Sequence, residues 1–140
     1  MIRRLVIVAT LVLGLSALAK AAGTVVMVEI THASARKVRF AWTSSAGGAA
    51  DATTTAAFDG KLVGLTTDPD GVAAPTDNYD VAITDVNGDD VLLGAGLNRD
   101  TATTEHVTEA SLAAVAGSKL TLAVTNAGNA TQGVVILFIR

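Results

Sequence analysis

Residues 79–93 read YDVAITDVNGDDVLL, and this stretch decides the fold class. Val81 and Ile83 alternate with polar or small neighbours, which is the period-two pattern of a half-buried β-strand. The Asn87-Gly88 dipeptide that follows is a strong hairpin signal, because a type I′ turn needs positive φ at both of its central residues. We therefore predict a strand, a two-residue turn at Asn87-Gly88, and a return strand at 91–93.

The same alternation recurs along the chain from residue 24 onward. Two neighbouring segments each place three apolar side chains on one face, and we expect these faces in the core. The residues are Val26, Val28, Ile30, Val38, Phe40 and Trp42. Further alternating segments lie at 61–65 and 120–125. Short strands at this spacing predict an all-β fold, a small β-sandwich of jelly-roll or immunoglobulin-like type with about six to eight antiparallel strands.

One segment near the C-terminal third departs from this period. Residues 108–116 begin with Thr108 as an N-cap, carry Glu109 in the first turn and end before Gly117. These features are typical of one short helix of one or two turns. The polar, threonine-rich stretch 98–106 before it is predicted to be an exposed loop.

The composition excludes several classes of function. The chain has no cysteine, which removes disulfide frameworks, thiolate nucleophiles and cysteine-based metal sites. Its net charge of −3 argues against a nucleic-acid partner, because phosphate binding depends on clustered Lys and Arg. The basic cluster Arg36, Lys37 and Arg39 places its last two members on one face of a strand, where we interpret them as solvated.

The motifs that could carry chemistry are incomplete. Residues 85–90 resemble a calcium loop, but the glycine comes two positions early and no glutamate closes the loop. His32 and His106 lack a second ligand at metal spacing, and no serine lies in a G-x-S-x-G elbow. No glycine-rich segment leads into a phosphate-binding helix. We therefore expect no enzyme, with no catalytic, cofactor-binding or metal-ligating residue and no cofactor.

Residues 1–22 have the three parts of a secretory signal. Arg3 and Arg4 precede an apolar run at 5–19, and small residues allow cleavage after Ala19 or Ala21. The run is shorter than the ~20 residues that a spanning helix needs, so we expect no stable membrane span after removal of the leader. The alternative is an uncleaved hydrophobic arm that packs against a neighbouring subunit. Residues 23–140 then form a single domain.

The segment 133–139 is apolar on both faces. Val134, Ile136 and Phe138 share one parity, and the candidate interface residues Val135, Leu137 and Ile139 share the other. In a two-layer sandwich the outer face of a strand is normally solvated. Either the short helix or a loop covers the second face, or the strand forms a subunit contact.

Three segments, at 36–43, 76–85 and 120–129, resemble a group of small β-rich proteins that are encoded among the virion structural genes of tailed bacteriophages. The resemblance covers most of the chain after residue 22 and consists of strand and turn patterns. It implies a non-enzymatic virion component, such as a head decoration or other particle-surface subunit. Its expected partners are identical subunits, the major capsid protein or other virion proteins, and its location is the virion.

The leader supports a different class of function. A signal-like segment 1–22 suggests a secreted or periplasmic β-sandwich module for binding or adhesion. Such a module would recognise a surface glycan or protein through loops such as 46–53 and 98–106, as sandwich scaffolds often do. The start of the mature chain separates the two hypotheses.

Overall fold

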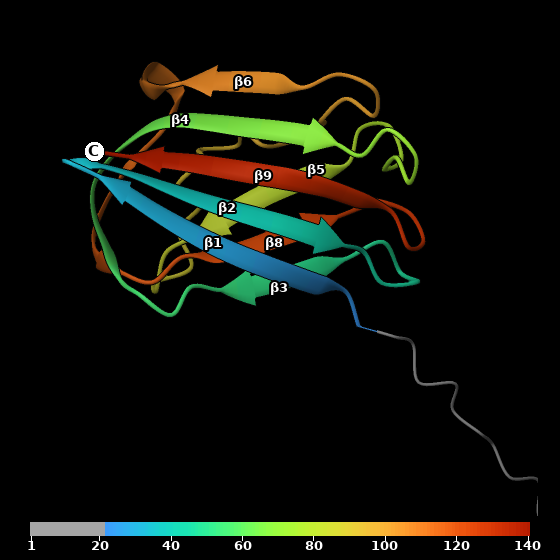
Figure 1. Ribbon diagram of the computed structural model, residues 1–140, viewed down its shortest axis with the longest axis horizontal. Helices are drawn as coiled ribbons and strands as arrows, with labels where there is room; N and C mark the ends of the chain where they lie inside the picture. The colour runs from blue at the N-terminus through green and yellow to red at the C-terminus, as the bar shows by residue number, and fades with distance from the viewer. Residues whose placement is uncertain (1–21) are drawn as a thin grey trace, which may run out of the picture.

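The computed structural model describes residues 22–140 and confirms the all-β prediction. Two antiparallel sheets pack face to face (Figure 1). The larger sheet has the order β1 (Thr24–His32), β2 (Ala35–Thr43), β9 (Gln132–Ile139), β4 (Phe58–Pro69) and β6 (Glu105–Thr108), and β7 (Ala114–Ser118) also pairs with β4. The smaller sheet has the order β3 (Ala50–Thr53), β8 (Thr121–Thr125) and β5 (Asp80–Thr84). The predicted leader at 1–22 lies outside the described residues except for Ala22.

The core lies between the two sheets and is lined by alternate residues of each strand. Val38, Phe40 and Trp42 on β2 are buried there, as the alternation predicts. The Trp42 ring lies against that of buried Tyr79, with centroids 5.7 Å apart, and this pair joins the larger sheet to the start of β5. Aromatic pairs at this separation pack favourably in cores that are otherwise aliphatic.

The prediction for β1 chose the wrong face. Val26, Val28 and Ile30 are 64%, 44% and 53% exposed, whereas Val25 and Met27 pack against the core. The register explains the difference, because it places Val25 opposite Trp42 and Met27 opposite Phe40. Apolar residues occur at both parities of this strand, so alternation alone could not select the buried face.

The chain does turn at Asn87-Gly88, but the turn is not type I′. Gly88 has φ of 89° and Asn87 has no positive φ. The Asp85 N–H donates to Asp89 O at 3.0 Å and the Gly88 N–H to Asp85 O at 3.1 Å, which makes a three-residue turn closed by a glycine bulge. Residues 91–93 form no return strand, because the Asp90 carboxylate accepts the N–H groups of nearby residues and holds a second turn.

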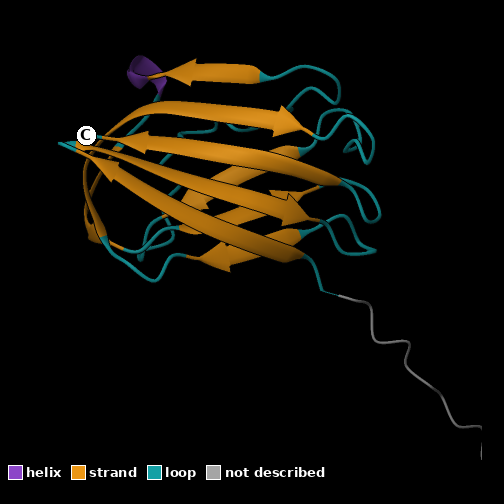
Figure 2. Ribbon diagram, in the orientation of Figure 1, coloured by secondary structure: helices purple, strands orange, loops and turns teal. Residues whose placement is uncertain are grey.

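The predicted helix is reduced to a single 3₁₀ turn, η1 (Glu109–Ser111), beside β6 (Figure 2). Residues 114–118 form β7 instead, because pairing with the twelve-residue β4 outweighs the local helix signals. Glu105 and His106, predicted to lie in an exposed loop, begin β6 on the same strand β4. In the described part of the chain no helix is long and apolar enough to cross a membrane.

Candidate functional site

The predicted interface residues lie in the core. β9 pairs with β2 on one side and β4 on the other, so it occupies the middle of the larger sheet. Val135, Leu137 and Ile139 are at most 1% exposed and point toward the smaller sheet. The prediction of these three residues as an interface is therefore wrong, because the inward side of β9 packs in the core beside Phe40 and Val38.

The opposite side of the larger sheet forms the candidate site. We call it the outer face and define it by six apolar side chains, which are Val26, Val28, Ile30, Val134, Ile136 and Phe138. The three on β9 are half-buried and the three on β1 are exposed. No described element covers this side of the sheet (Figure 1). Neither of the covers considered from the sequence, the short helix or a loop, lies over β9.

Strand register gathers these side chains into rows across the sheet. Val28 lies opposite Arg39, which lies opposite Ile136. One row further along, Lys37 stands between Ile30 and Phe138. Each basic side chain is therefore flanked by apolar side chains on both neighbouring strands. A surface of this composition, apolar with charges set in fixed places, is typical of a protein contact.

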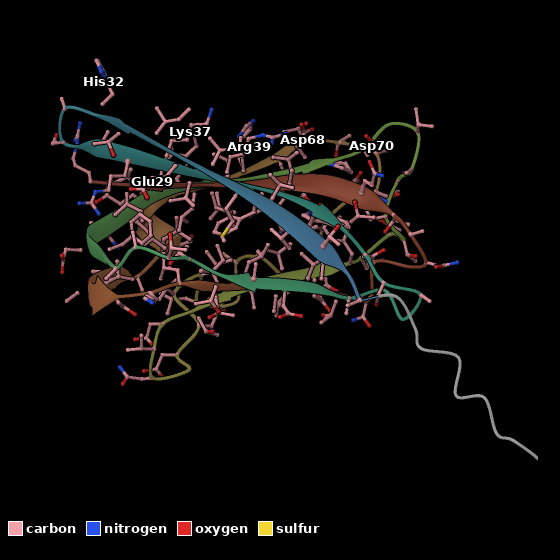
Figure 3. The ribbon with its side chains drawn as sticks, turned by 60° about the horizontal axis from the view of Figure 1, so that its bottom comes forward. Glu29, His32, Lys37, Arg39, Asp68 and Asp70 are labelled. Carbon is pink, nitrogen blue, oxygen red and sulfur yellow. The ribbon has the colours of Figure 1, made fainter. Side chains whose placement is uncertain are left out.

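Lys37 and Arg39 have no acidic partner among the described residues. The ion pair found in residues 22–140 joins Arg99 to Glu105 at 3.6 Å, on β6 and the loop before it. Figure 3 shows Lys37 and Arg39 on the same side of the sheet as Asp68 and Asp70. The outer face thus has two basic side chains on β2 and two acidic ones, Asp68 and Asp70, at the C-terminal end of β4.

A hollow of about 450 Å³ opens at this acidic end of the outer face. Thr24, Val26 and Arg39 line it from one side, and Asp68 and Asp70 from the other. Both carboxylates already serve the local structure. Asp68 accepts the Thr104 hydroxyl at 2.6 Å, and Asp70 accepts the N–H groups of Val72 and Ala73, which lower the pKa of Asp70. The two carboxylates of the hollow are therefore engaged in the local fold, and the hollow extends the outer face at this end.

Four of the polar residues considered for chemistry have structural partners. The Ser44 hydroxyl donates to Gly128 O at 2.6 Å, and Ser45 Oγ accepts the N–H groups of its own turn. His106 Nδ1 lies 2.9 Å from Thr66 Oγ1, and His32 ends β1. Asp85 binds the N–H groups of its turn. Within residues 22–140 no group of three His, Asp or Glu side chains could hold a metal ion.

The sequence prediction missed that Val26, Val28 and Ile30 face outward on β1, although the sequence contains a signal for this orientation. A two-residue turn at 33–34 pairs His32 with Ala35. Counting back from that pair places Val28 opposite Arg39 and Ile30 opposite Lys37. Because Lys37 and Arg39 are expected to face solvent, Val28 and Ile30 opposite them should face solvent too. The position of the turn and the two charges together therefore identify the exposed face of β1.

The outer face is the feature of this chain on which a function can be argued. It is regular, since it stands on the three paired strands β1, β2 and β9, and its apolar side chains are open to solvent on β1. Comparison of the chain with protein-family models, curated proteins and solved structures found no match.

Proposed function

We propose that the protein is a non-enzymatic structural protein of a tailed-bacteriophage virion, such as a head decoration or other particle-surface subunit. The observation that carries this proposal is the outer face, on which Val26, Val28 and Ile30 are 44–64% exposed in one stripe. Contiguous apolar surface of this kind marks a site of protein contact. The resemblance of three segments to virion proteins supports the particle as the place of that contact.

The arrangement suits a contact between fixed surfaces. The outer face belongs to a sheet whose central strand β9 is paired on both sides, so its side chains keep their spacing. Apolar burial supplies the affinity of such a contact, while Lys37 and Arg39 select partners with acidic groups at matching positions. The expected partners are identical subunits, the major capsid protein or other virion proteins.

The proposal is tested by quantifying the chain in purified virions. Virions of the phage that encodes the chain are isolated on a density gradient, and the chain is measured by mass spectrometry. We expect many copies per particle for the unchanged chain and few for a variant carrying Ile136→Ser and Phe138→Ser. Val86→Ser is the matched control, because Val86 is exposed but lies in a turn away from the outer face. Purified virions that lack the unchanged chain would contradict the proposal.

The alternative is a secreted or periplasmic module for binding or adhesion. It is favoured by one structural observation: β1 begins at Thr24, after both predicted cleavage positions, Ala19 and Ala21, so the mature chain would keep every described strand. The mass of the intact chain decides between the two. A start at Met1 supports the virion subunit, and a start at Lys20 or Ala22 supports the exported module.

A further inference from the structure

β1 is a long and regular edge of the larger sheet. It is nine residues long, pairs with β2 alone, and keeps one register from Thr24 to His32 without a bulge. It contains no proline or lysine, and Glu29 is its one acidic residue of the kind that opposes pairing with other chains at a sheet edge. The other outer strands differ: β3 and β6 have four residues each, β7 has five and pairs with β4 through a register shift, and β5 is bonded to the loop after it through Val81 N–H and Gly96 O.

The free edge of β1 presents a regular row of backbone groups. The two-residue turn makes His32 and Ala35 a hydrogen-bonded pair, and such pairs alternate along an antiparallel ladder. The N–H and C=O groups of the odd-numbered residues from Val25 to Thr31 therefore point away from β2. In the part of the chain that the structure describes, Met27, Glu29 and Thr31 have no other backbone partner.

The sequence of β1 is complementary to itself in one antiparallel register. With Val28 opposite Val28 of a second copy, all nine residues pair, and Val26 lies opposite Ile30. A shift of two residues in one direction places Glu29 opposite Glu29, and like charges directly opposite are unfavourable. A shift in the other direction shortens the ladder, and any odd shift exchanges the two faces.

This register also extends the outer face. The exposed stripe of one copy, Val26, Val28 and Ile30, would continue into the same stripe of the second copy across a two-fold axis at Val28. Every hydrogen-bonding group that one copy offers on this edge would meet its complement on the other, as in other isologous contacts. Glu29 would face Met27 instead of a like charge.

We propose that β1 is a strand-addition site at which a second copy of this chain pairs antiparallel about Val28, so that the two larger sheets become one. The inference rests on the proposed function as an assembly protein and names an identical subunit as the partner. Main-chain hydrogen bonds give such pairing its affinity, and the side-chain register gives it specificity.

The absence of cysteine allows a position-specific test. The full-length chain carrying Val28→Cys has one thiol, and the register places it directly opposite its own copy in a non-hydrogen-bonded pair. Cα atoms of such pairs are about 4.5 Å apart, which is within the range that a disulfide bridges. Under mild oxidation we expect a covalent dimer at least tenfold faster than for Val72→Cys, whose position is 99% exposed in a loop and reports random collision.

Two further variants test the register itself. Val26→Cys and Ile30→Cys should each cross-link slowly alone and quickly when mixed, because those positions face one another across the axis. Val28→Lys should convert a dimer into a monomer in sedimentation while circular dichroism stays unchanged. Cross-linking of Val28→Cys no faster than Val72→Cys, or a monomeric unchanged chain at the concentrations used for cross-linking, would overturn the inference.

These outcomes are independent of the virion test. A chain that is abundant in virions but does not cross-link through Val28 would retain the proposed function and refute the strand addition. A chain that cross-links as expected but is missing from virions would support the strand addition and refute the proposed function.

Discussion

The ring of Phe138 on β9 lies over Gly64 on β4. The two residues are paired in the sheet, and a Cβ added to Gly64 would come within 3.3 Å of Phe138 Cδ2. The glycine therefore makes room for the aromatic ring at the centre of the outer face.

Gly64→Val should displace this ring and destabilise the protein. Crowding a packed site costs about 1–3 kcal/mol, and we expect a loss in this range by urea unfolding. Gly71→Ala is the control, because nothing lies within 4 Å of its added Cβ and its φ is not positive. Equal stability of the Gly64→Val variant and the unchanged chain would show that the ring moves aside freely.

The two faces of β9 should respond differently to truncation. Leu137 is fully buried, so Leu137→Ala should lower the free energy of unfolding by about 2–5 kcal/mol. Ile136 is its half-buried neighbour on the outer face, and Ile136→Ala should lower the free energy of unfolding by clearly less. Chemical denaturation of both variants measures the contrast, and a reversed order would exchange the core and outer faces assigned to this strand.

Gly88 is the residue of the 86–88 turn that requires a positive φ. Its φ of 89° is unfavourable for a residue with a Cβ, and Gly88→Val should cost about 1–2 kcal/mol. Asn87→Ala should cost less, since Asn87 has no positive φ. Thermal unfolding compares the two, and similar losses would indicate that Asn87 shares the strained backbone of a type I′ turn.

Acid should weaken the fold through its turn carboxylates. Hydrogen bonds from backbone N–H groups, that of Asp89 first, hold the pKa of Asp85 below its ordinary value of 3.8, and those of Ala102 and Thr103 lower the pKa of Asp100. The unfolded chain therefore binds these protons more readily. Stability is full above the ordinary pKa and falls as pH decreases through the lowered values.

Unfolding at a series of acidic pH values measures this loss. Asp85→Asn should show a shallower dependence on pH than the unchanged chain, because one of the linked groups is gone. An identical slope in the variant would exclude Asp85 as a contributor.

Ionisation of the Tyr79 hydroxyl should lower the stability of the protein at alkaline pH. Burial is the main cause that raises the pKa of Tyr79 from 10.0 to about 12. Folding thus favours the neutral form of Tyr79. The contribution of this group to the stability of the folded protein is full below pH 10 and is lost as pH rises through 12. Because the chain has one tyrosine, its ultraviolet titration is unambiguous, and the fluorescence of the single Trp42 reports unfolding. A titration midpoint near pH 10 in the folded protein would contradict the buried hydroxyl.

The strand β2 is predicted well because its apolar residues from Val38 to Trp42 share one face, with Arg36 on that face only at the start of the strand. On β2, Lys37 and Arg39 mark the outside, so the alternate positions belong to the core. β1 and β9 lack this asymmetry, because apolar residues occupy both parities. Their orientation depends on register with β2, and register is a property of the assembled sheet.

The helix prediction for residues 108–116 was wrong for a related reason. Thr108 and Glu109 correctly indicate the start of a helical turn, and η1 forms at Glu109–Ser111. Beyond it, the long strand β4 offers an edge with which Ala114 and Val115 can pair. Long-range pairing outweighs propensity here, and no single-segment pattern carries that information.

The central place of β9 also constrains when the sheet can form. β2 and β4 are made early but have no contact in the ladder until β9 is inserted between them. A nascent chain that ends at β8 therefore lacks the strand that joins the hairpin of β1 and β2 to β4, and the core between the sheets is incomplete. Closure has to wait for the strand that is translated after all the others. Folding of this domain should thus be slow, as expected of folds that depend on contacts between distant parts of the chain.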